Sequence, residues 1–291
     1  VYVFVLEKRM LNRKGTGQKI MQEHEKNGVL YFTFPNLEEV SGEFVHGFSS
    51  RLGGVSKGEL STMNFSVNRG DTNENVTENY RRIAAAIGFQ AENLVCSDQT
   101  HTNHVRVVTL EDRGKGYDRP KDYHDVDGLV TNVPGLVLVT YYADCVPLFF
   151  VDPVHRAIGL SHSGWRGTVS DIAGETVKTM QETYGTDPSK LLAAIGPSIC
   201  QDCYEVSGDV IDAFKSHYDT SLYPLLYTEK ENGKFQLNLW EACRQNMLCA
   251  GLLPDRIQVT DVCTCCNSGI LFSHRASHGH RGNLAGFLGI R

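Results

Sequence analysis

The sequence predicts a single α+β domain, and three observations lead to this prediction. Of the 291 residues, 41% are hydrophobic and 21% charged, a composition typical of a globular protein with a substantial core. Apolar segments typical of buried strands mix with segments of helical periodicity, without a regular strand–helix–strand repeat. No internal repeat or low-complexity linker divides the chain. We therefore expect mixed β-sheets flanked by helices over residues 29–291, preceded by an N-terminal arm or helix over residues 1–28.

The predicted strands are short apolar runs, several of them bounded by glycine, proline or polar residues. In chain order they cover residues 28–34, 44–50, 94–96, 105–110, 128–131, 136–143, 147–152, 157–161, 191–195, 257–262 and 270–273. The runs between residues 128 and 161 are the most apolar part of the chain. We expect these strands to be buried on both faces, because a strand with one solvated face alternates apolar with polar residues.

The predicted helices are longer segments in which apolar residues recur at helical spacing. They cover residues 73–87, 167–184, 208–218 and 239–250, and residues 11–25 form either a helix or an arm. In the first of these, Ile83, Ala86 and Ile87 share one face, and Gly88 is placed to cap the C-terminus. Residues 51–56 are expected to form a loop in which two glycines can approach a ligand closely.

Charge and cysteine content restrict the cellular setting and the partners. The net charge is −6, which argues against a broad surface for nucleic acid or anionic membrane. The longest apolar stretch, residues 133–151, is interrupted by Asp144 and Pro147, so no membrane-spanning helix is expected. The nine cysteines are an odd number, which favours a reducing, cytoplasmic setting over a disulfide framework. No feature indicates an oligomeric state.

Histidine and cysteine, which commonly bind metals, occur in three short segments at or near the ends of predicted strands. They are Gln99-Thr-His101, Ala143-Asp-Cys145-Val-Pro147 and Ser161-His162-Ser-Gly-Trp-Arg-Gly167. A thiolate from Cys145 and two imidazoles from His101 and His162 suit zinc, and three protein ligands leave the fourth tetrahedral position open, as in catalytic sites. By spacing alone, a buried cysteine and two hydrogen-bonded core histidines are the simpler interpretation.

The same residues leave two other chemistries open. A thiolate beside an imidazole is the pair that a cysteine-nucleophile hydrolase requires, and metal content separates that function from a zinc enzyme. A laccase-type multicopper oxidase needs several His-x-His motifs, whereas His278-Gly-His280 is the one such motif among the 11 histidines. Copper is therefore less expected than zinc.

Two further cysteine groups have the spacing of metal ligands. They are Cys200-x-x-Cys203 and Cys263-x-Cys265-Cys266. These groups could form a second metal site, although thiols packed near the first site are the simpler interpretation of the sequence.

A set of short segments, in order from residue 46 to residue 275, resembles the YfiH-like family of zinc-containing purine nucleoside phosphorylases, formerly called polyphenol oxidases or laccases. The segments are His46-Gly-Phe-Ser-Ser-Arg-Leu-Gly-Gly-Val-Ser56, Asn68-Arg-Gly-Asp71, Asp98-Gln-Thr-His101, Asp127-Gly-Leu-Val-Thr131, Ala143-Asp-Cys-Val-Pro147, His162-Ser-Gly-Trp-Arg-Gly167, Gly196-Pro-Ser-Ile199, Tyr204-Glu-Val206, Cys263-Thr264 and Phe272-Ser-His-Arg275. In that family the corresponding histidine, cysteine and histidine hold zinc. The resemblance therefore implies that His101, Cys145 and His162 are metal ligands.

The resemblance implies phosphorolysis of purine nucleosides, including methylthioadenosine, and deamination of adenosine. Phosphate could then bind Arg51 beside the backbone of Gly53 and Gly54, with Arg166 as a second candidate. Deamination requires a carboxylate that moves protons, for which Asp144 and Asp127 are candidates and Glu205 is a weaker one. Asp144 could instead orient its neighbouring ligand. A nucleoside-binding module without turnover is the non-enzymatic alternative.

The C-terminal segment departs from the family pattern. Many members carry an Arg-Arg-Asp run followed by Thr-Gly-Arg, whereas this chain has His274-Arg275-Ala276-Ser277 and Arg281-Gly282-Asn283. Arg275 matches the first arginine of that pattern and is a candidate for substrate binding. Arg281 is the candidate replacement for a missing arginine.

Overall fold

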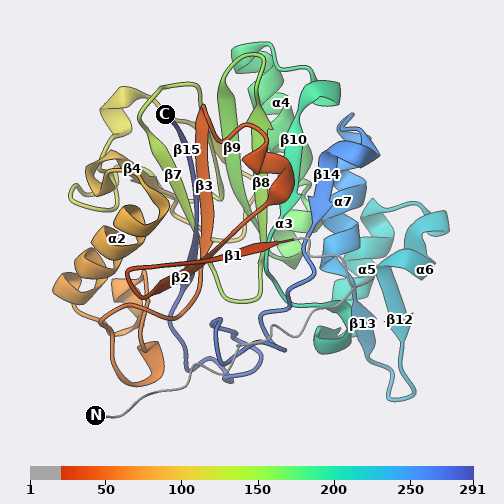
Figure 1. The fold of residues 1–291 in the computed structure, drawn as a ribbon. Coiled ribbons are helices and arrows are strands. Elements are labelled where there is room, and N and C mark those ends of the chain that lie inside the picture. The colour runs from red at the N-terminus through yellow and green to blue at the C-terminus, as the bar shows by residue number, and fades with distance from the viewer. Residues whose placement is uncertain (1–20) are drawn as a thin grey trace.

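Two six-stranded β-sheets pack face to face in the computed structural model, which describes residues 21–291 (Figure 1). The first sheet has the order β1 (Gln22–Lys26), β2 (Val29–Thr33), β3 (Phe44–Ser49), β15 (Leu284–Ile290), β7 (Val137–Tyr142) and β4 (Leu94–Cys96). The second has the order β14 (Ile257–Val259), β10 (Leu192–Ile195), β8 (Val146–Asp152), β9 (Ala157–Ser163), β6 (Gly128–Thr131) and β5 (Val105–Val107). A small third sheet contains β11 (Glu205–Val206), β13 (Phe235–Leu237) and β12 (Tyr227–Glu229).

Helices cover the outer faces of the two large sheets. The helices are α1 (Pro35–Glu38), α2 (Asn73–Ile87), α3 (Trp165–Val169), α4 (Ile172–Tyr184), α5 (Gly208–His217), α6 (Tyr223–Leu226) and α7 (Leu239–Cys249). Helix α2 lies on one side of the sheets, and α4, α5 and α7 lie on the other (Figure 1). None of the helices in residues 21–291 is long and apolar enough to cross a lipid bilayer.

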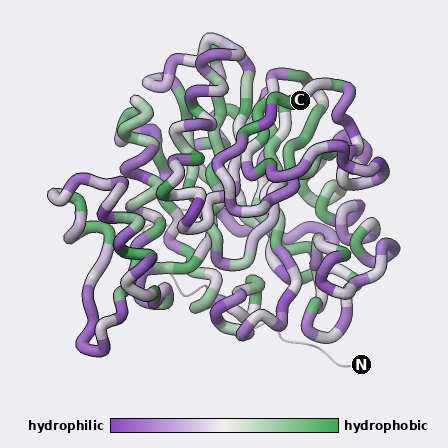
Figure 2. Tube along the Cα trace, turned by 180° about the vertical axis from the view of Figure 1, so that it is seen from behind, coloured by the Kyte–Doolittle hydropathy of each residue, from purple (hydrophilic) through white to green (hydrophobic). Residues whose placement is uncertain are grey.

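Three apolar layers hold these elements together. Side chains from both sheets, including Phe48, Leu138, Phe149 and Leu160, form the central layer. Helix α2 packs on the outer face of the first sheet, and α4, α5 and α7 pack on the outer face of the second. The strands of the centre are thus buried on both sides, as their continuous apolar character predicts. Figure 2 shows the same arrangement, with hydrophobic segments gathered in the interior and hydrophilic segments along the outer loops.

The structure confirms the α+β class and most of the predicted elements. Helix α2 and strands β4 and β6 have the predicted bounds, and Gly88 caps α2 at a φ of 101°. The helix expected over residues 167–184 is instead two helices. Asp171 separates them in a left-handed conformation and caps α4 by accepting a hydrogen bond from Gly174 N–H.

Two other predictions differ from the structure, and one strand was not predicted. Residues 22–26 form strand β1 rather than the end of the helix or arm predicted over residues 11–25, whose first ten residues lie outside the described part of the chain. Residues 270–273 are not a strand: they leave a turn, in which Asn267 O accepts hydrogen bonds from the amides of Ile270 and Leu271, and continue as irregular chain. The central strand β15 was not predicted, because Gly286 and Gly289 interrupt its apolar pattern.

Asn79 of α2 connects the loop of residues 51–56 to the rest of the protein by side-chain hydrogen bonds. Its fully buried amide accepts a hydrogen bond from Val55 N–H at 2.9 Å and donates to Ser56 Oγ and to Asn64 O. We expect Asn79→Ala to lower the free energy of unfolding by about 2–4 kcal/mol, because it leaves buried polar groups without partners. The matched control on the same helix is Glu78→Ala, which removes an exposed ion pair with Arg82 and should cost less than about 1 kcal/mol. Equal midpoints of urea unfolding for the two variants would contradict this role for Asn79.

Candidate active site

The structure brings together the three residues that the sequence indicates as metal ligands. His101 lies in the loop after β4, Cys145 lies in the turn between β7 and β8, and His162 lies in β9. One possible ligand atom from each residue lies within 4.8 Å of those of the other two. The distance from Cys145 Sγ to His101 Nε2 is 3.8 Å, and the two imidazole rings meet nearly at right angles with centroids 4.9 Å apart.

The carboxylate of Asp127 orients both histidines. One oxygen lies 2.7 Å from His162 Nδ1 and also accepts a hydrogen bond from His101 N–H. The other oxygen accepts hydrogen bonds from the backbone amides of Thr100 and Thr102. With Nδ1 engaged, His162 directs Nε2 away from Asp127, as metal-bound histidines commonly do.

Cys145, His162 and Asp127 shift one another's pKa values toward the charged forms. Burial alone would raise the pKa of Cys145, but His162 and His101 lower it to about 6. Burial would lower the pKa of His162, whereas Cys145 and Asp127 raise it to about 9. Burial would likewise raise the pKa of Asp127, but the hydrogen bond from His162 and those from the loop amides lower it to about 2. A thiolate is therefore accessible at neutral pH, and a thiolate is the form that binds metal.

Local backbone geometry lets these residues approach one another. His101 has a φ of 68° and Asp144 a φ of 89°, conformations that non-glycine residues adopt only when surrounding contacts hold them. Gly164, which follows β9, lies against both neighbouring ligands. A Cβ atom there would lie 2.6 Å from His101 Cδ2 and 3.2 Å from Cys145 Sγ. Only glycine leaves room for this arrangement of ligands.

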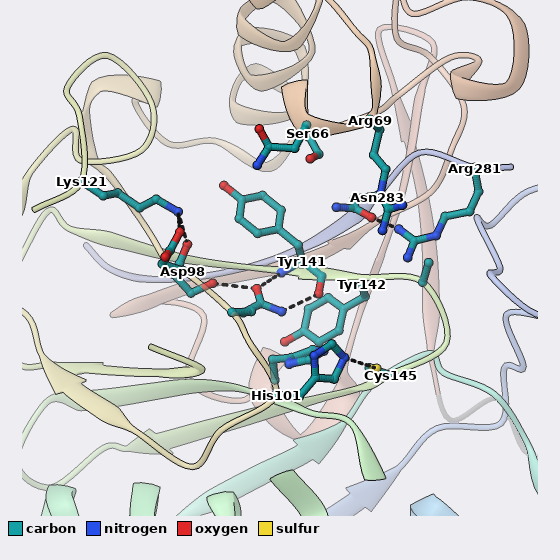
Figure 3. A pocket seen from close by; sticks show the side chains of 15 residues that line it. Ser66, Arg69, Asp98, His101, Lys121, Tyr141, Tyr142, Cys145, Arg281 and Asn283 are labelled. Atoms are coloured by element: carbon teal, nitrogen blue, oxygen red, sulfur yellow. Dashed lines mark hydrogen bonds and ion pairs between the residues drawn. The ribbon is translucent and has the colours of Figure 1, made fainter. Parts of the chain in front are cut away.

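A pocket opens beside the three residues, and charged and aromatic side chains line it (Figure 3). The further lining residues are Ser66, Asn68, Arg69, Ser97, Asp98, Gln99, Lys121, Tyr141, Tyr142, Ala143, Arg281 and Asn283. Lys121 pairs with Asp98 at one end of the pocket, whereas Arg69 and Arg281 extend toward the same region at the other end (Figure 3). A second pocket shares Asp98, Lys121 and Tyr141 and adds Tyr80 and Tyr117, so the cleft continues along α2.

Arg69 and Arg281 are neighbouring like charges, and Asp144 and Cys145 offset only part of their repulsion. Within residues 21–291, neither guanidinium has an ion pair with an acidic side chain. Arg281 donates to the side-chain oxygen of Asn283, and its buried Nε has no partner among the described residues. Burial, followed by repulsion from Arg69, lowers the pKa of Arg281 to about 10, so the group remains charged at neutral pH. Such a pair attracts an anion.

The structure does not bring the predicted residues Arg51, Gly53 and Gly54 into this pocket. The Arg51 guanidinium donates to the carbonyls of Ser61 and Ser268 at 2.9 Å and lies over the ring of Phe272, beside a different pocket. A Cβ at Gly53 or Gly54 would lie within 2.3 Å of a backbone oxygen. Close packing of the chain is thus sufficient to explain both glycines.

The other predicted residues surround the site without lining the pocket. Arg166 is exposed and lies over the ring of its neighbour Trp165. Arg275 donates to the carbonyls of Cys203 and Glu205. Both oxygens of Asp144 are occupied, one by Thr264 Oγ1 and one by the backbone N–H of Arg275. These contacts favour the alternative in which Asp144 positions the neighbouring Cys145.

Sequence reasoning assigned no role to Arg69, Asp98 and Lys121, although they line the pocket. Arg69 and Asp98 belong to segments that carry the family resemblance, Asn68-Arg-Gly-Asp71 and Asp98-Gln-Thr-His101. Their charge within those segments is the signal that could have indicated a function. Lys121 lies in a charged loop that offers no comparable signal.

Comparisons with known proteins agree with this arrangement. Residues 45–291 match the family model described as multi-copper polyphenol oxidoreductase laccase. A Geobacillus stearothermophilus protein named purine nucleoside phosphorylase YlmD is 38% identical over 248 residues, which cover 85% of this chain and 90% of that protein. A protein from an unidentified prokaryote, named adenosine deaminase RL5, is 34% identical over 238 residues, which cover 81% and 90% of the two chains.

The fold has a close match among solved structures. The crystal structure of the Bacillus licheniformis hypothetical protein YfiH superposes with a TM-score of 0.84 at 31% identity, covering 92% of this chain and 99% of that one. The order of the motifs, the ligand geometry and these similarities lead to one conclusion. The chain belongs to the YfiH-like family, whose family model carries the laccase description and whose relatives include proteins named for purine nucleoside phosphorolysis and adenosine deamination.

Proposed function

We propose that the protein is a zinc-dependent purine nucleoside phosphorylase that also acts on methylthioadenosine and deaminates adenosine. The single observation that carries the proposal is the position of the His101, Cys145 and His162 side chains in one pocket with Arg69 and Arg281, which have no acidic ion-pair partner within residues 21–291. The names of the relatives support the same chemistry, since one is a purine nucleoside phosphorylase and another an adenosine deaminase.

Zinc fits the donor set better than copper does. One thiolate and two imidazoles match the mixed sulfur and nitrogen ligands of zinc enzymes and leave a coordination position open. Bound there, zinc would polarise a substrate oxygen or lower the pKa of a water molecule. The described residues offer no cluster of several histidines of the kind that a multicopper oxidase requires. Asp127 would hold the histidines in the orientation that metal binding needs.

Arg69 and Arg281 would bind phosphate. In phosphorolysis a phosphate oxygen forms a bond to the ribose C1′ while the bond from C1′ to the purine nitrogen breaks, and that nitrogen gains a proton. Two guanidinium groups orient phosphate by charge-assisted hydrogen bonds. The continuation of the cleft past Tyr141 toward Tyr117 would accommodate the aromatic base.

Asp98 is the candidate for proton transfer, because it is the carboxylate that lines the pocket among the described residues. Asp127 and Asp144 are proposed as positioning residues, since neither lines the pocket and both hold neighbouring segments by hydrogen bonds. Deamination replaces the amino group of adenosine with the oxygen of water and releases ammonia, so it requires no phosphate. The two reactions can therefore be separated by their products.

The first test compares the metal content and the products of the wild type and Cys145→Ala. We expect the variant to bind about one metal ion fewer per chain and to lose nucleoside turnover while its circular dichroism is unchanged. With wild-type protein, adenosine should give adenine only when phosphate is present, and inosine whether or not phosphate is present. Turnover that survives metal removal but not thiol alkylation would favour a cysteine hydrolase. Copper with phenol oxidation would favour a laccase.

The second test compares Arg69, which we propose as a phosphate ligand, with Arg51, the candidate that the sequence indicated. We expect Arg69→Gln to raise the KM for phosphate roughly tenfold or more, because a charge-assisted hydrogen bond is lost, while phosphate-independent formation of inosine continues. Arg51→Gln should instead lower the unfolding temperature and leave the KM for phosphate near the wild-type value, since its bonds go to backbone carbonyls. The opposite pattern would restore Arg51 as the phosphate ligand.

The third test uses the close packing at Gly164. Gly164→Ala should weaken metal binding at least tenfold without removing a ligand, because the added methyl group displaces His101 and Cys145. The backbone of Gly164 has a φ of −76°, so alanine introduces no backbone strain. Gly42→Ala is the matched control, since nothing lies within 4 Å of its added Cβ. Competition with a chromogenic chelator measures the affinity. Equal affinities in the two variants would mean that this ligand geometry is not the one that binds metal.

A further inference from the structure

Two Cys-x-x-Cys segments meet at one end of the second sheet. Strands β10 and β14 are parallel neighbours, and each leads into one of these segments. Cys200 and Cys203 flank a short 3-10 helix after β10, and Cys263 and Cys266 lie in the turns after β14. A bridge between Ser198 and Cys263 continues the pairing of the two strands into the segments. Parallel strands end at the same edge, which explains how pairs so distant in sequence come together.

The four sulfur atoms have the geometry of a tetrahedral metal site. All of them lie within 4.8 Å of one another, and the distance between Cys203 Sγ and Cys266 Sγ is 3.5 Å. Four thiolates around a zinc ion at a Zn–S distance of about 2.3 Å lie about 3.8 Å apart. Cys200 and Cys263 are buried, whereas Cys203 and Cys266 are partly buried, so the cluster is closed on one side.

Backbone hydrogen bonds and a nearby cation suit thiolates at this position. Cys263 Sγ accepts hydrogen bonds from the amides of Cys200 at 3.2 Å and Cys266 at 3.4 Å. Such N–H···S bonds stabilise negative charge on sulfur. Four thiolates and one divalent ion carry a net charge of −2, and the guanidinium of Arg275 donates to the carbonyl of Cys203. The positive charge of Arg275 would offset part of this negative charge.

We propose that Cys200, Cys203, Cys263 and Cys266 bind a structural zinc ion, distinct from the one proposed for the pocket. The ligand spacing, two Cys-x-x-Cys pairs far apart in the chain, is typical of structural zinc sites, which have four protein ligands and no open position. The site is independent of the reaction proposed above, because its existence requires only the metal.

The second zinc ion would fix the two segments that hold Asp144. Thr264, which follows Cys263 within the second segment, donates its hydroxyl to Asp144 Oδ1 at 2.7 Å. On the other segment, Ile199 N–H donates to the backbone carbonyl of Asp144 at 3.0 Å. Asp144 precedes Cys145, so the four-cysteine site supports the backbone beside the first metal ligand. This makes the four cysteines positioning residues for the active site.

The experiment measures metal content in the full chain, purified without a metal-binding tag. We expect about two zinc ions per chain in the wild type, about one in Cys145→Ala, and about one in the double variant Cys200→Ser with Cys203→Ser. Cys265→Ser is the matched control, because this residue lies between the ligands in sequence but outside the set of four. It should retain both ions.

Cobalt substitution in the Cys145→Ala background provides a measurement that needs no change in the cluster itself. Co²⁺ bound by four thiolates should give intense sulfur-to-cobalt charge transfer bands and visible bands shifted to longer wavelength than those of a mixed nitrogen and sulfur site. Adding Cys200→Ser and Cys203→Ser should abolish these bands.

Two results would overturn the proposal. One is Cys145→Ala protein that contains no zinc and binds Co²⁺ without these bands. The other comes from counting reactive thiols in the denatured wild-type protein, before and after treatment with a reductant. Two additional thiols after reduction would indicate a disulfide such as Cys203–Cys266. If the cluster holds zinc while nucleosides are not turned over, the proposed function alone fails.

Discussion

The buried carboxylate of Asp127 is the interaction on which the active site depends. It lies just before β6 and accepts hydrogen bonds from His162 and from three successive backbone amides, those of residues 100–102. Burying an ionised carboxylate is costly unless it is fully hydrogen-bonded, and here these bonds offset the cost. One side chain therefore sets the position of His101 through its backbone and of His162 through its ring. Removing this carboxylate would release two ligands at once.

The two-sheet architecture explains why the site lies where it does. The chain leaves the first sheet at the end of β7 and enters the second at the start of β8, and residues 143–145 make that crossing. Cys145 is therefore placed at the junction of the sheets, beside His162 of β9 and opposite the loop that follows β4. The left-handed backbone of Asp144 turns the chain at this point. The surrounding strands are completely buried, so the site rests on rigid elements.

Local patterns in the sequence determined how much could be predicted. Helix α2 was predicted to the residue because its apolar spacing and Gly88 act within one segment, and in the structure Thr72 caps its N-terminus. Strand β15 was not predicted because its two glycines, Gly286 and Gly289, are explained only by the neighbouring strands. A Cβ at Gly289, for example, would lie 2.8 Å from Val137 Cγ2. Residue type and family resemblance indicated the three candidate metal ligands that the structure brings together. The pairing of Arg69 with Arg281 depends on folding, because no pattern links positions so far apart.

The contacts of Asp144 link the two groups of candidate metal ligands. A positive φ at a non-glycine residue costs about 1–3 kcal/mol and persists only where the surroundings hold it. Thr264 and the backbone of Arg275 hold the carboxylate, and the segment that leads into Cys200 holds the carbonyl. Both Cys-x-x-Cys segments therefore contact Asp144, whose backbone is strained. A metal ion shared by the four cysteines would add to the hydrogen bonds that already join the two segments and would fix them relative to each other. The second metal ion that we propose would thereby hold Asp144, next to Cys145, through both segments.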